Sequence, residues 1–444
     1  MLLRSLHIAS RQLFYLAVVL IILGLLALMG AMWLSEQVAD REDEIAAWAS
    51  DKTGYPVNIE QAGLYWYDLI PKLEVRGITL QQKDGSAAIA TVGQMYLSLD
   101  ILQTLQLGEP VVADASIEQA RLAVERSSEG KWQLTGLEKN QTRRAQTSLP
   151  EVTRWLSWLR QLELTDIRLT VNDQYQPALS GRYQLQQLQL DFSDGQWQAD
   201  ARVIVPEKLG TGFTLQGRAS IDEDYRLIDW RGSVETAALA LPPLVESLAL
   251  RGLQIVSGEV AGRATIAYSD GGELDADAEL EITQLSLDSA LAETQADPLS
   301  FARLQGRLNF SKTHSRWQLQ GENMQIIGAE QPWPVTAFSV EHDQQGEIAL
   351  STDYLRLSDV TALALLMQDM PDWLVNAQPA GDIYDLTLRY QPEQGIQAAT
   401  LRAKQLAVLP WQDFPGVNAL SFQLDWQQNQ ARLTLDSQQT TIYA

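Results

Sequence analysis

The sequence predicts a mainly β protein in which a single N-terminal transmembrane helix precedes an extended, twisted, antiparallel sheet built from repeats, with a few short helices. Two observations carry this prediction. Residues 13–34 form a run without a charged side chain, and such a run is long enough for a helix that spans a bilayer. From Tyr55 onward, apolar residues recur mostly at a period of two, which is the period of a β-strand.

The run at 13–34 is predicted to anchor the chain in a membrane. Arg4 and Arg11 precede it, whereas the segment 36–44 that follows is mainly acidic. Because positive residues flank the cytoplasmic side of a transmembrane helix, residues 1–12 are expected in the cytoplasm and the rest of the chain on the far side.

A cleaved signal peptide is the alternative interpretation of this run. Such a signal needs a shorter apolar core and a site with small residues. Gly30 and Ala31 are small, but Met32 and Trp33 follow them directly. The sequence therefore favours an uncleaved anchor.

Composition narrows the possible functions of the remaining chain. Hydrophobic residues make up 45% and charged residues 20% of the sequence, so the exported part has enough apolar surface to fold. The net charge of -23 is opposite to what nucleic acid attracts, so no nucleic-acid partner is expected. The absence of cysteine excludes disulfides and thiolate chemistry.

Helices are expected only in a few places. A collar helix is predicted within 35–54, where helix-forming residues end at Gly54. Residues 138–161 are predicted to form a loop and an amphipathic helix. Shorter helices are expected at 241–250 and at 359–374, the latter capped by Asp359.

The remaining residues divide into two β segments. The first is expected at 55–137, and the second, built from repeats, at 162–444 with continuation beyond the chain end. Four related tetrapeptides recur in the middle of the chain at spacings of about 35 to 45 residues, which is typical of a stacked, quasi-linear architecture. They are Leu179–Arg182, Leu215–Arg218, Val260–Arg263 and Leu304–Arg307.

Several strands share a pattern of two alternating apolar pairs separated by one extra residue. An extra residue turns every later side chain to the opposite face unless the strand contains a β-bulge. The sequence therefore predicts a bulge in the middle of these strands and an apolar lining on one face. The predicted lining residues are Leu73, Val75, Ile78, Leu80, Leu162, Leu164, Ile167, Leu169, Val171, Leu185, Leu188, Leu190, Phe192, Leu285 and Leu287.

No catalytic constellation is evident. Glu341, His342 and Asp343 are consecutive, but neighbours on a strand point to opposite faces and cannot form a triad. Alternating acidic residues from Asp275 to Glu281 are expected to form a solvated strand face rather than a calcium site. The sequence therefore predicts a non-enzymatic protein without a metal or another cofactor.

The apolar face of the strands must be covered by a second sheet, by helices or by lipid. The predicted helices are too few to cover it. Periodicity alone leaves a closed sandwich and an open groove equally supported.

Beyond these patterns, the chain resembles the AsmA-like family, in particular its YhdP type. The N-terminal similarity follows the anchor and the collar helix. The segments that carry the resemblance are Thr53–Ile59, Trp66, Pro71–Leu80, Leu357–Val360, Pro379–Arg389, Phe414–Leu420 and Leu433–Ser437.

This resemblance implies a single-pass protein of the Gram-negative inner membrane, with its bulk in the periplasm and an open β-groove. It also implies bridge-like transfer of phospholipid between the inner and outer membranes, in support of outer-membrane lipid homeostasis. The lining residues would then contact acyl chains. The alternative is a membrane-anchored scaffold that binds other envelope proteins during envelope assembly and transports no lipid. Members of this type continue beyond the point where this sequence stops, so the outer-membrane end is missing if this sequence is a fragment.

Overall fold

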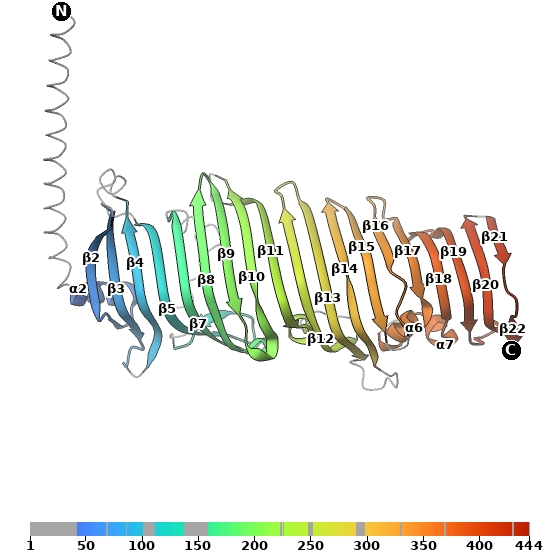
Figure 1. Cartoon of the computed structure of the whole chain (residues 1–444), viewed down its shortest axis with the longest axis horizontal. Helices are drawn as coiled ribbons and strands as arrows, with labels where there is room; N and C mark the ends of the chain where they lie inside the picture. The colour runs from blue at the N-terminus through green and yellow to red at the C-terminus, as the bar shows by residue number, and fades with distance from the viewer. Residues whose placement is uncertain are drawn as a thin grey trace, which may run out of the picture. The chain divides into compact units, whose positions relative to one another are not determined.

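The computed structural model describes residues 42–67, 70–85, 87–100, 112–136, 159–222, 224, 226–246, 252–289, 298–328, 331–367, 370–428 and 430–443 (Figure 1). The predicted transmembrane run at 13–34 and most of the predicted loop and helix at 138–161 lie outside these residues. Among the described residues, no helix combines the length and apolarity that crossing a membrane requires.

The chain divides into two compact units. Unit 1 consists of residues 1–125, 132–170 and 185–192, and unit 2 of residues 126–131, 171–184 and 193–444. Each unit is described by itself.

Unit 1 contains one described helix and the strands β1 to β8, of which β5, β7 and β8 extend into unit 2. Strand β3 pairs antiparallel with β1, β2 and β4, strand β4 pairs with β5, and β5 pairs with β7. The elements are α2 Glu42–Thr53, β1 Val57–Asn58, β2 Gln61–Tyr67, β3 Ile70–Gln81, β4 Ala88–Leu99, β5 Val112–Arg126, β6 Trp132–Leu134, β7 Gln161–Asp173 and β8 Gly181–Ser193.

The core of unit 1 forms where α2 meets the first strands. Val75, Ala62 and Ile59 are buried, and Ile45 and Ala46 of α2 pack against them. Helix α2 lies within the range 35–54 that was predicted for a collar helix, and its place as a collar beside a membrane stays a prediction.

Unit 2 is an open antiparallel sheet in which each strand from β9 to β20 pairs with the next, and β20 pairs with both β21 and β22. Its first strands and short helices are η2 Pro177–Leu179, β9 Gln196–Ile204, η3 Glu207–Leu209, β10 Gly210–Ile221, β11 Leu227–Ala240, α5 Leu241–Val245, β12 Leu253–Tyr268, β13 Glu273–Ser289 and β14 Leu299–Thr313. The later ones are β15 Arg316–Gly328, β16 Thr336–His342, β17 Ile348–Arg356, α6 Leu357–Leu366, α7 Asp372–Ala377, β18 Ala380–Gln391, β19 Gly395–Val408, β20 Gly416–Gln427, β21 Gln430–Leu435 and β22 Thr441–Tyr443.

The two ends of these strands differ. Short connections join β10 to β11, β12 to β13, β14 to β15, β16 to β17 and β18 to β19 at one end, which we call the hairpin end. At the other end, the helix end, η3, α5, α6 and α7 connect the strands. Figure 1 shows α6 and α7 at the lower ends of the strands and the short hairpins at their upper ends.

The mainly β, antiparallel fold class is confirmed, and the sheet is open rather than closed into a sandwich. The helix predicted at 359–374 is wrong in its bounds, because the structure has two helices, α6 and α7, in this region. Asp359 is not a cap: α6 begins before it, and its carboxylate accepts a hydrogen bond from Trp333 Nε1 at 2.7 Å. The carboxylate of Asp359 therefore makes a tertiary contact with Trp333 instead of the local helix cap that the sequence predicted.

Candidate functional site: the apolar face of the sheet

The predicted bulges appear as left-handed residues in the middle of the strands. Gly77, Asp166, Gln284 and Gln405 each have a φ between 50° and 63°, and each is the second residue of the middle pair in its apolar pattern. The bulge prediction is confirmed in β13 and β19, where the register shows one extra residue relative to β12 and to β20. In β3 the register with β4 continues past Gly77 without a shift, so no residue is inserted there. In β7 the left-handed Asp166 agrees with the prediction, and β8 has no left-handed residue at this pair.

These left-handed residues keep one face of a strand apolar on both sides of the kink. In β3, Leu73 and Val75 precede Gly77 and Ile78 follows it, yet all three apolar side chains pack into one cluster. Ile282 and Leu285 do the same on either side of Gln284. A regular strand would have turned the second member of each set to the opposite face.

Strand pairing extends this one-sided pattern across unit 2. Residues that lie directly opposite each other in an antiparallel pair share a face of the sheet. Ala278, for example, lies between Ala264 of β12 and Leu308 of β14. Together such pairs define what we call the apolar face of unit 2. Its larger members are Phe213, Leu215, Val234, Ile266, Leu280, Leu308, Phe310, Leu319, Val340, Leu350, Leu388, Leu401 and Leu424.

Among the residues that the structure describes, those that cover the apolar face lie at the helix end. There Leu285, Leu287 and Leu366 form a buried cluster, and Leu366 of α6 has no exposed surface. Away from this cluster the face is open: the side chains of Leu215 and Ile266 are each 41% exposed.

One close contact shapes the apolar face in its middle. A Cβ atom at Gly321 would lie 2.1 Å from Cε1 of Phe338, the residue opposite on β16. Glycine at this position therefore lets the Phe338 ring lie across the neighbouring strand. A larger residue would push the ring away from the sheet.

The opposite face of unit 2 is polar and carries ion pairs between neighbouring strands. Arg263 binds Glu235 with Nε 3.0 Å from the carboxylate, and Arg303 binds Glu281 at 2.9 Å. Glu279 lies 3.9 Å from Arg307. The acidic series that the sequence assigned to a solvated face therefore lies on this polar face. Each exposed pair stabilises the fold by less than about 1 kcal/mol.

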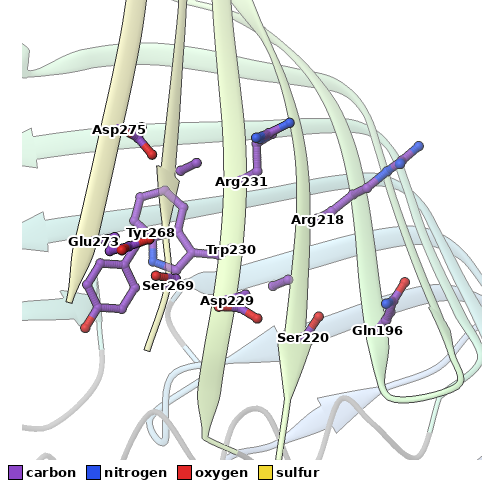
Figure 2. A pocket seen from close by; sticks show the side chains of 12 residues that line it. Gln196, Arg218, Ser220, Asp229, Trp230, Arg231, Tyr268, Ser269, Glu273 and Asp275 are labelled. Atoms are coloured by element: carbon purple, nitrogen blue, oxygen red, sulfur yellow. The ribbon is translucent and has the colours of Figure 1, made fainter. Parts of the chain in front are cut away.

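A hollow on the polar face extends across the hairpin ends of β9 to β13, where Trp230 and Tyr268 also contribute to its lining. Figure 2 shows Arg218 and Arg231 beside Asp229, Ser220 and Gln196 in this hollow, which has a volume of about 480 Å³. Arg218 and Arg231 are directly opposite each other on β10 and β11. Because its lining is charged and open to solvent, this hollow is not suited to an acyl chain.

The described residues bring no catalytic set together. His342 Nδ1 lies 3.3 Å from the carbonyl of Ser315, and its ring stacks on Trp317 with centroids 5.7 Å apart. Glu341 instead accepts a hydrogen bond from Gln318 at 2.7 Å on the other face. The expected separation of these two neighbours is confirmed. Within the described ranges, no group of three or more possible metal ligands occurs.

A row of aromatic residues runs along the hairpin end of the apolar face. The pattern within single strands did not predict this row. Trp230 lies opposite Tyr268, and Trp317 lies opposite His342. Trp230 and Tyr268 stack with centroids 6.4 Å apart. We call the following set the aromatic row: Trp197, Trp230, Tyr268, Trp317, His342 and Tyr390.

A signal for this row exists in the sequence. Most members lie within one residue of a turn that joins two strands, as Tyr268 does before Ser269-Asp-Gly-Gly272, whereas Trp230 lies three residues inside β11. A search for aromatic residues beside turn signals would have found most of the row.

Comparison with known proteins identifies the family. The family model described as YhdP protein matches residues 1–444. The chain belongs to the YhdP family. The resemblance predicted from the sequence is therefore confirmed. No curated protein shows significant similarity to the chain. A solved bacterial polysaccharide outer membrane secretin matches at 9% identity over 57% of this chain and 77% of its own, with a TM-score of 0.12, and this likeness carries no argument.

The lining residues predicted for this YhdP family member fall into two groups. Leu285 and Leu287 are buried beneath α6, so the chain itself covers them. Val75, Ile167 and Val171 are also buried. The remaining predicted residues are partly exposed: Leu73, Ile78, Leu80, Leu162, Leu164, Leu169, Leu185, Leu188, Leu190 and Phe192.

Proposed function

We propose that this chain is a lipid-transfer protein of the cell envelope whose apolar face carries the acyl chains of phospholipids between the inner and outer membranes. In this role it supports outer-membrane lipid homeostasis. The observation that carries the proposal is the apolar face of unit 2, which continues from β9 to β20 and which the described part of the chain covers at the helix end alone.

An uncovered apolar face of this extent needs an occupant. Soluble proteins rarely leave contiguous apolar surface exposed beyond a few hundred Å². Each Å² removed from water stabilises an assembly by about 25 cal/mol, so the exposed surfaces of Leu215 and Ile266 favour any partner that covers them. Acyl chains adapt to the small and large side chains that alternate along this face, because they are flexible and purely apolar.

Membership in the YhdP family supports a place in the cell envelope. We propose that the run at 13–34 anchors the chain in the inner membrane with residues 1–12 in the cytoplasm. The β-sheet is then periplasmic and forms a groove. Movement of lipid along it needs no catalytic chemistry from the chain.

Identification of bound lipid tests this proposal. The full chain is purified in parallel with two variants that place an arginine on consecutive residues of β14, Leu308→Arg and Asn309→Arg. Leu308 pairs with Ala278 and lies on the apolar face. Asn309 pairs with Asp277 and lies on the polar face. Both variants keep residues 13–34, so lipid bound around the anchor is the same in all three samples.

Mass spectrometry of the extracted lipids is expected to find more phospholipid per chain in the unmodified protein and in Asn309→Arg than in Leu308→Arg. A charge placed on the apolar face must be desolvated by an acyl chain, which is unfavourable. Equal amounts of lipid in all three samples would count against transport on this face and favour the scaffold alternative.

A further inference from the structure

The apolar face changes in composition from one end of the strands to the other. At the helix end its residues are aliphatic or phenylalanine, as in the cluster around Leu285 and Leu366. At the hairpin end it finishes in the aromatic row, in which Trp230 and Tyr268 are each 36% exposed. The face therefore runs from fully apolar to amphipathic side chains along each strand.

Tryptophan and tyrosine have a defined preference in such a gradient. Their rings are apolar and their N–H and O–H groups are polar, so they gather where a hydrocarbon region meets water. In membrane proteins they form belts at the level of the lipid headgroups. The aromatic row has this composition over six strands of one sheet, from β9 to β18.

A cationic side chain lies within the row. Lys312 is directly opposite Leu274 on one side and Trp317 on the other, so it replaces an aromatic residue at this position. It is exposed and has no ion-pair partner among the residues that the structure describes. Trp317 in turn stacks on His342. A lysine and an imidazole thus flank one indole ring in a chain whose net charge is -23.

The open part of the face is long enough to hold the acyl chains of a lipid. Leu304 is eight positions from Lys312, and of the β14 residues that pack against the buried cluster it lies nearest to the hairpin end. At about 3.3 Å per residue this distance is roughly 26 Å. The hydrocarbon of one bilayer leaflet is about 15 Å thick, half of the 30 Å core. A lipid with its headgroup at the row therefore reaches the middle of the face without meeting the helices.

We propose that the aromatic row is the headgroup site for phospholipids, with their acyl chains directed toward the helix end and Lys312 and His342 contacting the phosphate. This proposal rests on the proposed function, because it assigns an orientation to the lipid that the apolar face carries. A protein partner would need neither the amphipathic row nor the gradient, since an added strand or helix buries apolar side chains along its whole length.

The orientation can be tested with two photoreactive phospholipids that share one headgroup and one chain length. One carries the reactive group in the headgroup and the other at the end of an acyl chain. Both are bound to the full chain, irradiated, and mapped by mass spectrometry of peptides. The headgroup probe is expected to label segments 268–274 and 312–317, and the chain-end probe segment 305–308 in the middle of β14.

The outcomes separate this proposal from the proposed function. The opposite labelling pattern, or equal labelling of both sets of segments by both probes, would overturn the orientation and leave lipid binding in place. No labelling of either set by either probe would overturn lipid binding itself, and the orientation with it.

Two lysine-to-alanine variants, whose lipid affinities are compared, provide a second measurement. Lys312→Ala is expected to weaken binding of phosphatidylglycerol about 3- to 5-fold, as for one exposed charge contact, and to leave binding of the matching diacylglycerol unchanged. Lys208→Ala removes an exposed lysine from η3 at the helix end and is the control. An equal effect of both variants, or an equal loss of both lipids in Lys312→Ala, would overturn the headgroup site.

Discussion

The two ends of the apolar face show how one sheet can be both a stable core and a binding surface. At the helix end, α5 and α6 cover the strands, and Leu366 is completely buried. At the hairpin end the connections are too short to fold back over the sheet, and residues such as Trp230 remain partly exposed. The same strands therefore place their stabilising contacts at one end and leave the other available to a ligand.

This division explains how an open sheet stays folded although the described residues form no second layer over it. Backbone pairing and the covered cluster stabilise the strands, while the polar face is solvated and carries ion pairs between strands. Mutations at the two ends should consequently separate stability from binding.

The largest expected effect on stability is at the helix end. Leu366→Ala should lower the free energy of unfolding by about 2–5 kcal/mol, because it leaves a cavity in a fully buried cluster. The matched change at an open position, Leu215→Ala, should cost less than about 1 kcal/mol, since this side chain is 41% exposed. Urea denaturation measures both. Equal losses would show that the two regions are packed alike.

The next effect concerns transfer of lipid along the open part of the face. Ala264→Arg places a charge among apolar side chains of β12, where Ala264 lies between Val234 and Ala278. It should slow transfer of a fluorescent phospholipid between donor and acceptor vesicles about 10-fold, because acyl chains must pass an unpaired charge.

Thr265→Arg, on the polar face of the same strand between Ser233 and Asp277, is the control and should leave the transfer rate unchanged. If both variants transfer lipid at the rate of the unmodified chain, the apolar face is not the path.

A smaller effect on the free energy of unfolding is expected from the buried side chain of Tyr354, which lies on the polar side near the helix end. Burial, with a hydrogen bond of 2.6 Å to Asp382, raises the pKa of Tyr354 from 10.0 to about 12. The unfolded chain therefore loses this proton at a lower pH than the folded chain, and the free energy of unfolding should fall as pH rises from about 10 to about 12.

Tyr354→Phe should flatten this part of the pH dependence while lowering stability near neutral pH through loss of the hydrogen bond to Asp382. Thermal unfolding across this pH range provides the measurement. A slope that persists unchanged in the variant would assign the titration to another group.

The smallest effect is expected for the ion pairs on the polar face. Arg402 Nη2 lies 2.6 Å from Asp385, and both side chains are exposed to solvent. Arg402→Ala should change the free energy of unfolding by less than about 1 kcal/mol, and added salt should reduce the difference further. A loss as large as that of Leu366→Ala would mean that the polar face, and not the covered end, holds the sheet together.

The sequence predicted the local features of this fold better than the features that depend on pairing. The left-handed residues Gly77, Asp166, Gln284 and Gln405, two of them in bulges, could be predicted because one extra residue between apolar pairs changes the period within a single strand. The split of the region 359–374 into α6 and α7 was not readable, since Asp359 is engaged by Trp333, a residue 26 positions earlier.

The candidate site follows the same rule. Its one-sided apolar character is visible in each strand, whereas the aromatic row exists only because register places Trp230 beside Tyr268 and Trp317 beside His342. Period-two analysis of one strand contains no information about the register with the next. The burial of Leu285 and Leu287 beneath α6 is likewise a tertiary contact, which their own pattern does not predict.

The most direct test of the account is site-specific photo-crosslinking at two consecutive positions of β14 in living cells. A photoreactive residue at Leu308 projects from the apolar face, and one at Asn309 projects from the polar face. The account predicts that Leu308 captures phospholipid and Asn309 does not. Equal capture of phospholipid at both positions, or capture of a protein and no lipid at Leu308, would contradict it.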